Sequence, residues 1–394
     1  MNFLKNIYHL LERKLAARKM SRLGIRVIGI TGSYGKTNSA VAITAALSEK
    51  YKVAQTDLNL DPIFSIPALI RSLKDEKYVV VELGVDGFGQ MRQYFKMIRP
   101  SVGVLTGIAP VHADRDHLGS LEGIMKEKGE LLSILPAKGY LLCNWDDQRV
   151  QEMVSRAKIK IIKYGFSKEA DIQVREVKVS VVGTRVKIQI PKGEIELNLK
   201  LIGRHHAYTA ALAVGIGLEE RLSLEQIKKG LEKIEPLAGR MNLENGPAGT
   251  FILNDSRRAN VASTLAGLET LEDCEAERKI AVLGQMGEMG DYEETGHRQV
   301  GKKVAAMKLD YLVCVGPATR FIEEEAKKGL DPNRVFYADD VFEAASQLKE
   351  LLRPGDLWYL KGSLLKHLER IPLLLKGKKV DSDELASHRY QVYQ

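Results

Sequence analysis

The sequence has few cysteines, few aromatic residues and no long apolar run. Its 394 residues include only Cys143, Cys274 and Cys314, which lie too far apart for a zinc site or a disulfide framework. No apolar stretch approaches the roughly 18 residues of a membrane span, and the N-terminus has no signal-peptide core followed by a cleavage site. These absences exclude a disulfide-rich secreted protein, and they predict a cytoplasmic protein without a membrane-spanning helix.

The charge is moderately basic, with 59 lysine and arginine residues against 51 acidic residues and a formal charge of +8. This balance favours acidic ligands such as nucleotides, or an anionic membrane surface. Aromatic residues make up only 6% of the chain, and the basic residues are spread along it without a recognisable nucleic-acid-binding module. We therefore expect no nucleic-acid partner. The length suggests two or three domains.

Residues 1–24 are predicted to form an amphipathic helix. Two interpretations stay open: the helix packs on the body of its own protein, or it makes peripheral contact with a membrane surface. The apolar positions at helical spacing are Phe3, Leu4, Ile7, Leu10, Leu11 and Leu15.

From residue 25 onward, short apolar strands alternate with helical segments. Residues 26–31 predict a buried strand, a glycine-rich turn follows, and residues 37–50 predict a helix. Residues 77–84 and 101–108 are two further short runs rich in β-branched residues. This alternation predicts an α/β fold with a parallel, doubly wound sheet.

Residues 171–202 alternate apolar and charged residues, which predicts a small antiparallel meander appended to that sheet. The proline and glycine of residues 235–241 suggest a hinge, after which a second pattern typical of a Rossmann-like α/β domain begins. We predict a central P-loop domain at 25–237 and a C-terminal α/β domain at 238–394. The strands predicted in the second domain are 250–255, 279–287, 311–316, 334–339 and 356–362.

Residues 32–37, GSYGKT, lie between a predicted strand and a predicted helix, the context that a phosphate-binding loop needs. Backbone N–H groups at the helix start would face the anion, Lys36 would bring a positive charge to the outer phosphates, and the Thr37 hydroxyl could hold Mg²⁺. The residues expected to contact the nucleotide here are Gly32, Ser33, Tyr34, Gly35, Lys36, Thr37 and Asn38.

This loop resembles that of the Mur ligase family of amide-forming enzymes, and further blocks extend the resemblance in the same order. They include VVVELGVDGFGQM at 79–91 and LIGRHHAYTAALAVGIGL at 201–218. Residues 105–135 are similar above all to the branch that adds the D-alanyl-D-alanine dipeptide to the peptidoglycan precursor. Residues 282–301 and 353–370 complete the set, so the resemblance covers roughly residues 25–375.

The resemblance implies ATP and two Mg²⁺ ions at this site. Thr37 and Glu82 match the ligands of the first ion, and His112 and Lys128 match those of the second. The family carries the lysine as a carbamate, which turns a cation into a carboxylate-like ligand and allows it to bind a cation beside crowded phosphates.

The resemblance also implies roles around the transferring phosphoryl group and the nucleotide. Lys36 and Arg240 would neutralise the charge that develops on the phosphoryl group, with His112 and Lys128 completing the catalytic set. His205, Asp255 and Lys361 match nucleotide-binding positions, the last two on a mobile C-terminal domain whose closure would exclude water.

Several positions depart from the family pattern, and we expect them mainly in loops that face the substrate. Two arginines at 257 and 258 suggest an anionic substrate group, with two exposed loop residues as the alternative. The departing residues are Pro62, Ser65, Gly107, His206, Arg257, Arg258 and Val261.

These observations favour an ATP-dependent, ADP-forming ligase that joins a carboxylate, expected to be a muramoyl peptide, to the amine of an amino acid or dipeptide. D-alanyl-D-alanine is the expected amine, and the product would serve peptidoglycan synthesis. The same chemistry on a lipid-linked precursor, a folate or another cofactor remains open, as does a non-catalytic ATP-binding partner subunit. We expect a monomer.

Overall fold

The computed structural model describes residues 2–57 and 60–380, and it contains two compact units. Unit 1 consists of the described residues up to Val177 together with Arg185–Leu199 and His206–Ile234. Unit 2 consists of Lys178–Thr184, Lys200–His205 and the described residues from Glu235 onward. No helix in the described ranges is both long and apolar enough to cross a membrane.

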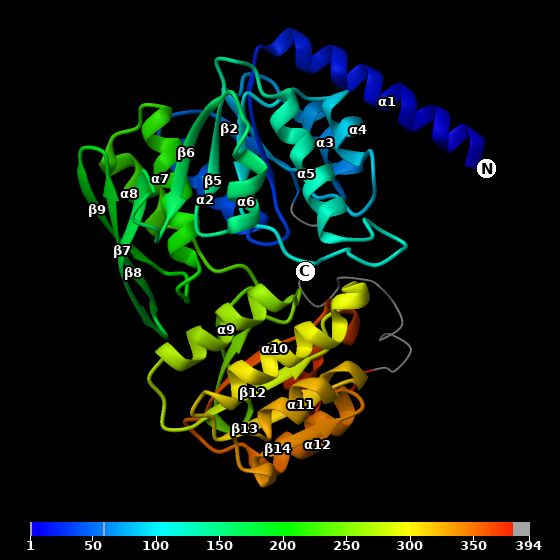
Figure 1. Ribbon diagram of the computed structural model, residues 1–394, viewed down its shortest axis with the longest axis vertical. Coiled ribbons are helices and arrows are strands. Elements are labelled where there is room, and N and C mark those ends of the chain that lie inside the picture. The colour runs from blue at the N-terminus through cyan, green and yellow to red at the C-terminus, as the bar shows by residue number, and fades with distance from the viewer. Residues whose placement is uncertain (1, 58–59, 381–394) are drawn as a thin grey trace. The chain divides into compact units, whose positions relative to one another are not determined.

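Unit 1 is built on a sheet that is parallel from its first strand to its seventh, with hairpins after it (Figure 1). Short turns join the last three strands, which are Ile172–Ser180, Gly183–Ile190 and Gly193–Leu199. Neighbouring strands joined by such short turns run antiparallel. These features confirm the predicted parallel sheet with an appended meander. In sheet order the strands are β2 (Val53–Gln55), β3 (Tyr78–Glu82), β1 (Arg26–Thr31), β4 (Val102–Leu105), β5 (Tyr140–Asn144), β6 (Lys160–Gly165), β7 (Ile172–Ser180), β8 (Gly183–Ile190) and β9 (Gly193–Leu199).

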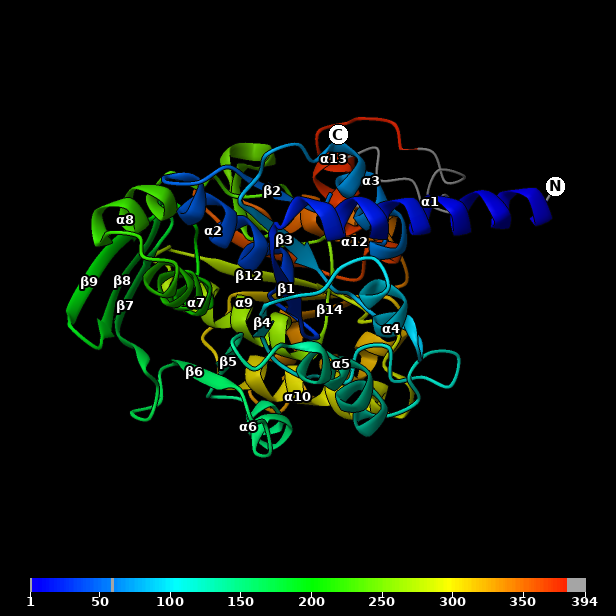
Figure 2. The same cartoon turned by 90° about the horizontal axis from the view of Figure 1, so that it is seen from above.

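Helices cover the sheet of unit 1 in two groups, as a doubly wound fold requires (Figures 1 and 2). In the first group α2 packs against α7 and α8, and in the second α5 packs against α4 and α6. The helices are α2 (Lys36–Ser48), α3 (Pro62–Ser72), α4 (Gln90–Phe95), α5 (Leu121–Ile134), α6 (Gln148–Val154), α7 (His206–Glu219) and α8 (Leu224–Glu232).

The N-terminal helix α1 (Asn2–Leu23) packs against α3 through its C-terminal half (Figure 2). Ala16 and Met20 are buried, Glu12 forms an ion pair with Arg71, and Lys19 Nζ donates to the Arg71 carbonyl over 2.7 Å.

The predicted apolar face of this helix is only partly described. Leu15 is 63% exposed, so this apolar position does not pack on the body of the protein. The small Ala16 is buried instead and lets the helix approach its neighbour. The side chains of the other predicted apolar positions lie outside the described set: Phe3, Leu4, Ile7, Leu10 and Leu11.

The segment containing Pro62 and Ser65 is a helix, and the prediction that these residues lie in a loop was wrong. Asp61 caps α3 by accepting the Ile63 N–H over 2.8 Å, and Pro62 occupies the first turn, where a missing N–H costs nothing. Pro67 lies inside the helix.

Unit 2 contains a second sheet with the order β10-β11-β15-β12-β13-β14, parallel except for the β10–β11 pair. Alternate residues of the strands face two different hydrophobic clusters, as the period of a β-strand requires. One cluster includes Leu283 and Tyr359 and packs under α9 and α10, and the other includes Val282 and Trp358 and packs under α12. This arrangement confirms the predicted second α/β sheet.

The elements of unit 2 are as follows: β10 (Asn242–Asn245), β11 (Phe251–Asn254), α9 (Val261–Asp273), β12 (Lys279–Gly284), α10 (Glu293–Ala305), β13 (Tyr311–Val315), α11 (Arg320–Ala326), β14 (Val335–Ala338), α12 (Val341–Leu351), β15 (Leu357–Lys361) and α13 (Ile371–Leu375).

Candidate active site

The carboxyl ends of three parallel strands bring the candidate site of unit 1 together. The register pairs Ile30 of β1 with Glu82 at the end of β3, and Thr31 with Leu105 at the end of β4. The loops that follow these strands therefore start at one edge of the sheet, where ligands of open α/β sheets bind.

The loop between β1 and α2 is held by the loop that follows β4. Ser33 N–H donates to the Gly107 carbonyl over 2.7 Å, and Ser33 Oγ donates to the Ala109 carbonyl over 2.9 Å. Gly32 has φ of 150°, and a Cβ there would lie 2.0 Å from Thr106 Oγ1, so only glycine fits. The Ser33 amide is thus committed to the protein, whereas we expected the loop amides to face a phosphate.

The helix start still offers groups for an anion. Gly35 adopts a left-handed conformation before α2, and the first amide groups of the helix have no intrahelical acceptor. Lys36 Nζ folds back to donate to the Gly32 carbonyl over 2.6 Å, and half-buried Asn38 lies in the first turn. Amide groups, the helix dipole and an ammonium group together form a phosphate-binding loop.

Tyr34 fills the space above Gly107, which explains the glycine at that position. A Cβ on Gly107 would lie 2.1 Å from the Tyr34 hydroxyl oxygen. The hydroxyl donates to Asp147 Oδ2 over 3.2 Å, and Thr106 Oγ1 donates to the Tyr34 carbonyl. Burial, reinforced by Asp147, raises the pKa of Tyr34 well above its usual value. The side chain is a link between loops, so any nucleotide contact of Tyr34 comes through its main chain.

Thr37 and Glu82, the residues predicted to hold the first metal, lie in contact. Thr37 Oγ1 donates to Glu82 Oε2 over 3.2 Å. The other carboxylate oxygen, Oε1, is buried and has no hydrogen-bond partner among the described residues. A buried carboxylate oxygen without a partner is costly, and a hydroxyl beside it adds a second hard oxygen. This donor set fits Mg²⁺.

Lys128, on α5, is buried with only 2% exposure. Burial lowers the pKa of its amine well below the usual value, and the positive charge of Lys36 lowers it further, while Glu127 and Asp86 act in the opposite direction. Glu127 accepts two main-chain N–H groups at the start of α4. No ion pair of Lys128 is found within residues 2–57 and 60–380.

His112 lies in the loop after β4, half-buried and in the left-handed region with φ of 61°. Such backbone conformations are costly outside glycine and concentrate at functional sites. The ring of His117 in the same loop lies 5.3 Å away, centroid to centroid.

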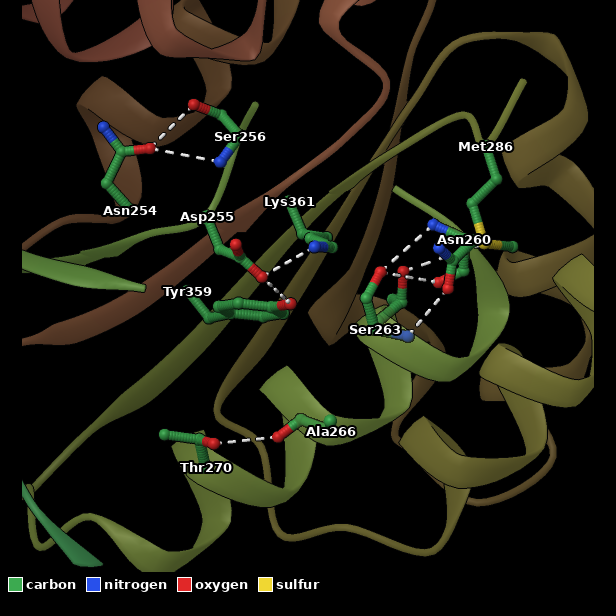
Figure 3. A network of polar contacts seen from close by, with 11 residues as sticks. Asn254, Asp255, Ser256, Asn260, Ser263, Ala266, Thr270, Met286, Tyr359 and Lys361 are labelled. Atoms are coloured by element: carbon green, nitrogen blue, oxygen red, sulfur yellow. Dashed lines mark hydrogen bonds and ion pairs between the residues drawn. The ribbon is translucent and has the colours of Figure 1, made fainter. Parts of the chain in front are cut away.

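The candidate site of unit 2 centres on the buried Lys361 at the end of β15 (Figure 3). Its Nζ donates to Asp255 Oδ2 over 2.6 Å, and the Tyr359 hydroxyl donates to the same oxygen over 3.3 Å. Burial lowers the pKa of Lys361, although Asp255 opposes this shift and Arg240 adds to it. The structure therefore brings Asp255, Lys361 and Arg240 into one electrostatic environment.

His205 belongs to unit 2 and feels the charges of Asp255 and Lys361, whereas its neighbour His206 belongs to unit 1. Burial lowers the pKa of His205 to about 4, with Asp255 raising it and Lys361 lowering it. His206 begins α7 in unit 1 and is also buried. The two adjacent histidines thus lie on different units.

The two arginines that the sequence suggested as a pair have different surroundings. Arg257 is half-buried and its N–H donates to the Gly239 carbonyl over 3.2 Å, next to Arg240. Arg258 is exposed.

His297, which lies in the block at 282–301 that resembles the family, has a structural role. It accepts the Met286 N–H at Nε2 over 3.0 Å and bonds the Glu293 carbonyl through Nδ1 over 2.7 Å. Burial lowers its pKa, so it stays neutral and fixes the loop after β12.

Comparison with known proteins decides the family. The sequence profile of the Mur ligase middle domain matches residues 30–217, and that of the Mur ligase, glutamate ligase domain matches residues 239–364. The chain belongs to the Mur ligase family. The Mur ligase described here is 30% identical over 362 residues to the UDP-N-acetylmuramoyl-tripeptide--D-alanyl-D-alanine ligase of Bacillus subtilis (strain 168), covering 91% of this chain and 78% of the relative.

Solved structures agree with this assignment. MurF from Acinetobacter baumannii superposes with a TM-score of 0.85 at 26% identity, covering 94% of this chain and 81% of that chain. MurF ligase from Thermotoga maritima, solved in complex with ADP, shares the fold with a TM-score of 0.83 at 20% identity, covering 94% and 84% of the two chains. The predicted family and fold class are confirmed, and so is the enzyme class: this Mur ligase is an ATP-dependent enzyme that forms amide bonds.

Sequence patterns missed several residues of the two sites. Thr106 and Asp147 hold the phosphate loop, and Tyr359 supports Asp255. None was predicted as a site residue, although Thr106 and Tyr359 lie within blocks that match the family. Asp86, whose charge acts on the pKa of Lys128, lies within the matching block at 79–91. Its position four residues after Glu82 is the only sequence signal for it.

Proposed function

We propose that this Mur ligase adds D-alanyl-D-alanine to the terminal carboxylate of a muramoyl tripeptide, with conversion of ATP to ADP and phosphate, in peptidoglycan synthesis. The observation that carries the proposal is the buried Lys128 with its lowered pKa beside Lys36 of the phosphate loop. The named activity of a relative that covers 91% of this chain supports the choice of substrates. Because the reaction consumes ATP, the cytoplasm stays the expected compartment.

The chemistry follows from the low reactivity of a carboxylate toward an amine. Transfer of the γ-phosphoryl group from ATP to a carboxylate oxygen releases ADP and forms an acyl phosphate. The dipeptide amine then attacks the acyl carbon, the tetrahedral intermediate collapses, and inorganic phosphate leaves as the amide forms and the amine loses a proton.

Lys36 and Arg240 are proposed to neutralise the charge on the transferring phosphoryl group. Fixed positive charge in a water-poor site is commonly the largest contribution to such catalysis. Thr37 and Glu82 are proposed to hold one Mg²⁺, and His112 and a modified Lys128 the other. When bound, Mg²⁺ would screen the phosphate oxygens and orient them for in-line transfer.

The surroundings of Lys128 suit the carbamate that the family resemblance implies. Only a neutral amine can attack CO₂, and burial beside Lys36 favours the neutral form. The amine and CO₂ give a carbamate and one proton, so Lys128 becomes an anion. An ammonium group at Lys128 would be repelled by the positive charge of Lys36, whereas the carbamate would be attracted to it.

Asp255, Lys361 and His205 are proposed to bind the nucleoside part of ATP. The Lys361 ion pair and the Tyr359 hydroxyl fix the Asp255 carboxylate, so its second oxygen is oriented before a ribose hydroxyl arrives. His205, with its pKa of about 4, stays neutral and can accept or donate one hydrogen bond.

The decisive experiment measures ADP release with defined substrate pairs. We expect release to require both a UDP-muramoyl tripeptide and D-alanyl-D-alanine, with lipid-linked precursors, folate and single amino acids as comparisons. Release with a different carboxylate would overturn the assigned substrate. ATP hydrolysis that ignores both the carboxylate and the amine would instead support a non-catalytic nucleotide-binding role.

The carbamate has its own test. Purified protein exposed to ¹³C-bicarbonate should show a carbamate carbon resonance that is absent from Lys128→Ala. Full activity of Lys128→Ala in buffer depleted of CO₂ would contradict the assignment.

A further inference from the structure

The loop after β4 contains a second histidine beside His112. The rings of His112 and His117 lie 5.3 Å apart with an interplanar angle of 46°. Their ligand nitrogens lie within 4.8 Å of each other. Both side chains are half-buried.

A carboxylate orients His117. Its Nδ1 lies 2.6 Å from Asp114 Oδ1. Asp114 itself is fixed, because Oδ1 also accepts the Asp116 N–H over 3.1 Å and its carbonyl accepts the Gly119 N–H over 3.0 Å. Metal-binding histidines almost always use one nitrogen for such a partner and the other for the ion. With Nδ1 facing Asp114, Nε2 is the atom through which His117 would bind an ion.

The backbone holds His112 as firmly. Its φ of 61° is stabilised by the Leu118 N–H, which donates to the His112 carbonyl over 3.0 Å. Residues 112 and 118 thus close the loop that carries both imidazoles. Strained backbone of this kind persists where the surrounding structure over-determines it, and functional sites are where it concentrates.

We propose that His117 supplies a second imidazole ligand beside His112, so that this loop binds a borderline divalent cation such as Mn²⁺ more tightly than Mg²⁺. The inference rests on the metal role of His112 in the proposed function. Mg²⁺ keeps oxygen ligands, whereas imidazole suits the transition metals. Two nitrogens at about 2.1 Å from one ion stand about 3 Å apart, which side-chain rotation can reach from the observed separation.

Water and phosphate oxygens would complete the coordination shell. The alternative is that the Asp114–His117 pair only stabilises the turn. In that case removing His117 lowers stability and leaves metal binding unchanged.

The test titrates the full chain with Mn²⁺ and, separately, with Mg²⁺, in the absence of nucleotide. Binding is followed by the Mn²⁺ electron paramagnetic resonance signal and by calorimetry. We expect tighter binding of Mn²⁺ than of Mg²⁺. His117→Ala should weaken Mn²⁺ binding at least 10-fold and leave Mg²⁺ binding within twofold, and Asp114→Asn should weaken Mn²⁺ binding about 10- to 100-fold.

Two further variants keep the test decisive. Asp116→Asn is the matched control, because it changes an exposed carboxylate of the same loop whose side chain does not orient His117. His117→Gln keeps the side-chain volume and replaces the nitrogen ligand by an amide, so it should also lose the preference for Mn²⁺. Mn²⁺ binding equal to wild type in either folded His117 variant would overturn the inference.

Failure of the inference and failure of the proposed function give different results. If no substrate pair releases ADP but His117→Ala still weakens Mn²⁺ binding, only the proposed function fails. If ADP release depends on both substrates but His117→Ala binds Mn²⁺ normally, only the inference fails. Normal Mn²⁺ binding by His112→Ala would overturn the inference together with the metal role of His112.

Discussion

Each unit of this Mur ligase buries one lysine in its candidate site, and the two lysines have opposite electrostatic surroundings. Lys361 of unit 2 forms an ion pair with Asp255 at 2.6 Å. Lys128 of unit 1 is equally buried, but within the described residues it has no ion pair and the charge of Lys36 adds to the cost of its ammonium form. Burial lowers the pKa of both amines.

The difference between Lys361 and Lys128 indicates that the two buried lysines have different roles. A paired lysine is compensated and can fix a neighbouring carboxylate, which is how Lys361 prepares Asp255. A buried ammonium without a partner is a net cost to folding, so the group persists only if chemistry needs it. The comparison assigns Lys361 to organising the site and Lys128 to a modification or a reaction.

Lys361→Met should produce the largest change in stability. It leaves the Asp255 carboxylate without its partner, and breaking a buried ion pair costs about 3–5 kcal/mol. Unfolding by denaturant, followed through the buried Trp358 in a Trp145→Phe background, would measure this for unit 2. The double variant with Asp255→Asn should recover most of the loss, and an unchanged unfolding midpoint in the single variant would contradict the comparison.

Lys128→Met should show the reverse pattern. We expect ADP release to fall about 100- to 1,000-fold, the scale of losing one electrostatic group at a transition state. The free energy of unfolding should stay the same or rise, because the buried amine that is removed has no ion-pair partner among the described residues. A loss of stability as large as that of Lys361→Met would show that Lys128 is as well compensated as Lys361.

His205 makes the environment of Lys361 sensitive to pH. Its pKa is about 4 in the folded state against about 6.5 when unfolded, so below pH 6.5 the unfolded chain binds the proton preferentially. Stability should therefore fall as pH drops from 6.5 to 4, by up to about 3 kcal/mol from this group. His205→Gln should flatten that part of the curve relative to wild type. If the free energy of unfolding depends on pH in the same way in wild type and His205→Gln, then His205 is not the source of the pH dependence.

Gly107→Ala should be the smallest of these changes and tests the packing of unit 1. The added methyl group meets the Tyr34 ring, and overpacking of this kind costs about 1–3 kcal/mol. Tyr34→Ala in the same protein should relieve the clash, so the double variant should be more stable than the sum of the single changes predicts. If the two losses of stability in thermal unfolding simply add in the double variant, the proposed contact between residue 107 and the Tyr34 ring is wrong.

Local pattern predicted most of the fold. The apolar runs of β1, β3 and β4 and the alternation in β7 to β9 are properties of short segments, so they could be identified without a structure. The four-residue β10 has no comparable pattern, and α3 was taken for a loop because its two prolines mask a capped helix. Helical spacing alone did not show that Leu15 is exposed and Ala16 buried, because it does not say which face of a helix meets a neighbour.

The candidate site divides in the same way. The phosphate loop could be located from its own six residues and their flanks, and family resemblance proposed Glu82, His112 and Lys128. Nothing in the sequence showed that Tyr34 covers Gly107 or that Asp114 orients His117 toward His112.

By itself, then, the sequence determined the alternating α/β pattern, the phosphate loop and the family, because each is written in neighbouring residues or in blocks of fixed order. Only the tertiary structure decided which charges are paired. Parallel strands place loops that are tens of residues apart at one sheet edge, and burial there sets the pKa of Lys128, while in unit 2 Asp255 and Lys361 meet across 106 positions of sequence. Desolvation and ion pairing depend on what surrounds a side chain in space, which no local pattern encodes.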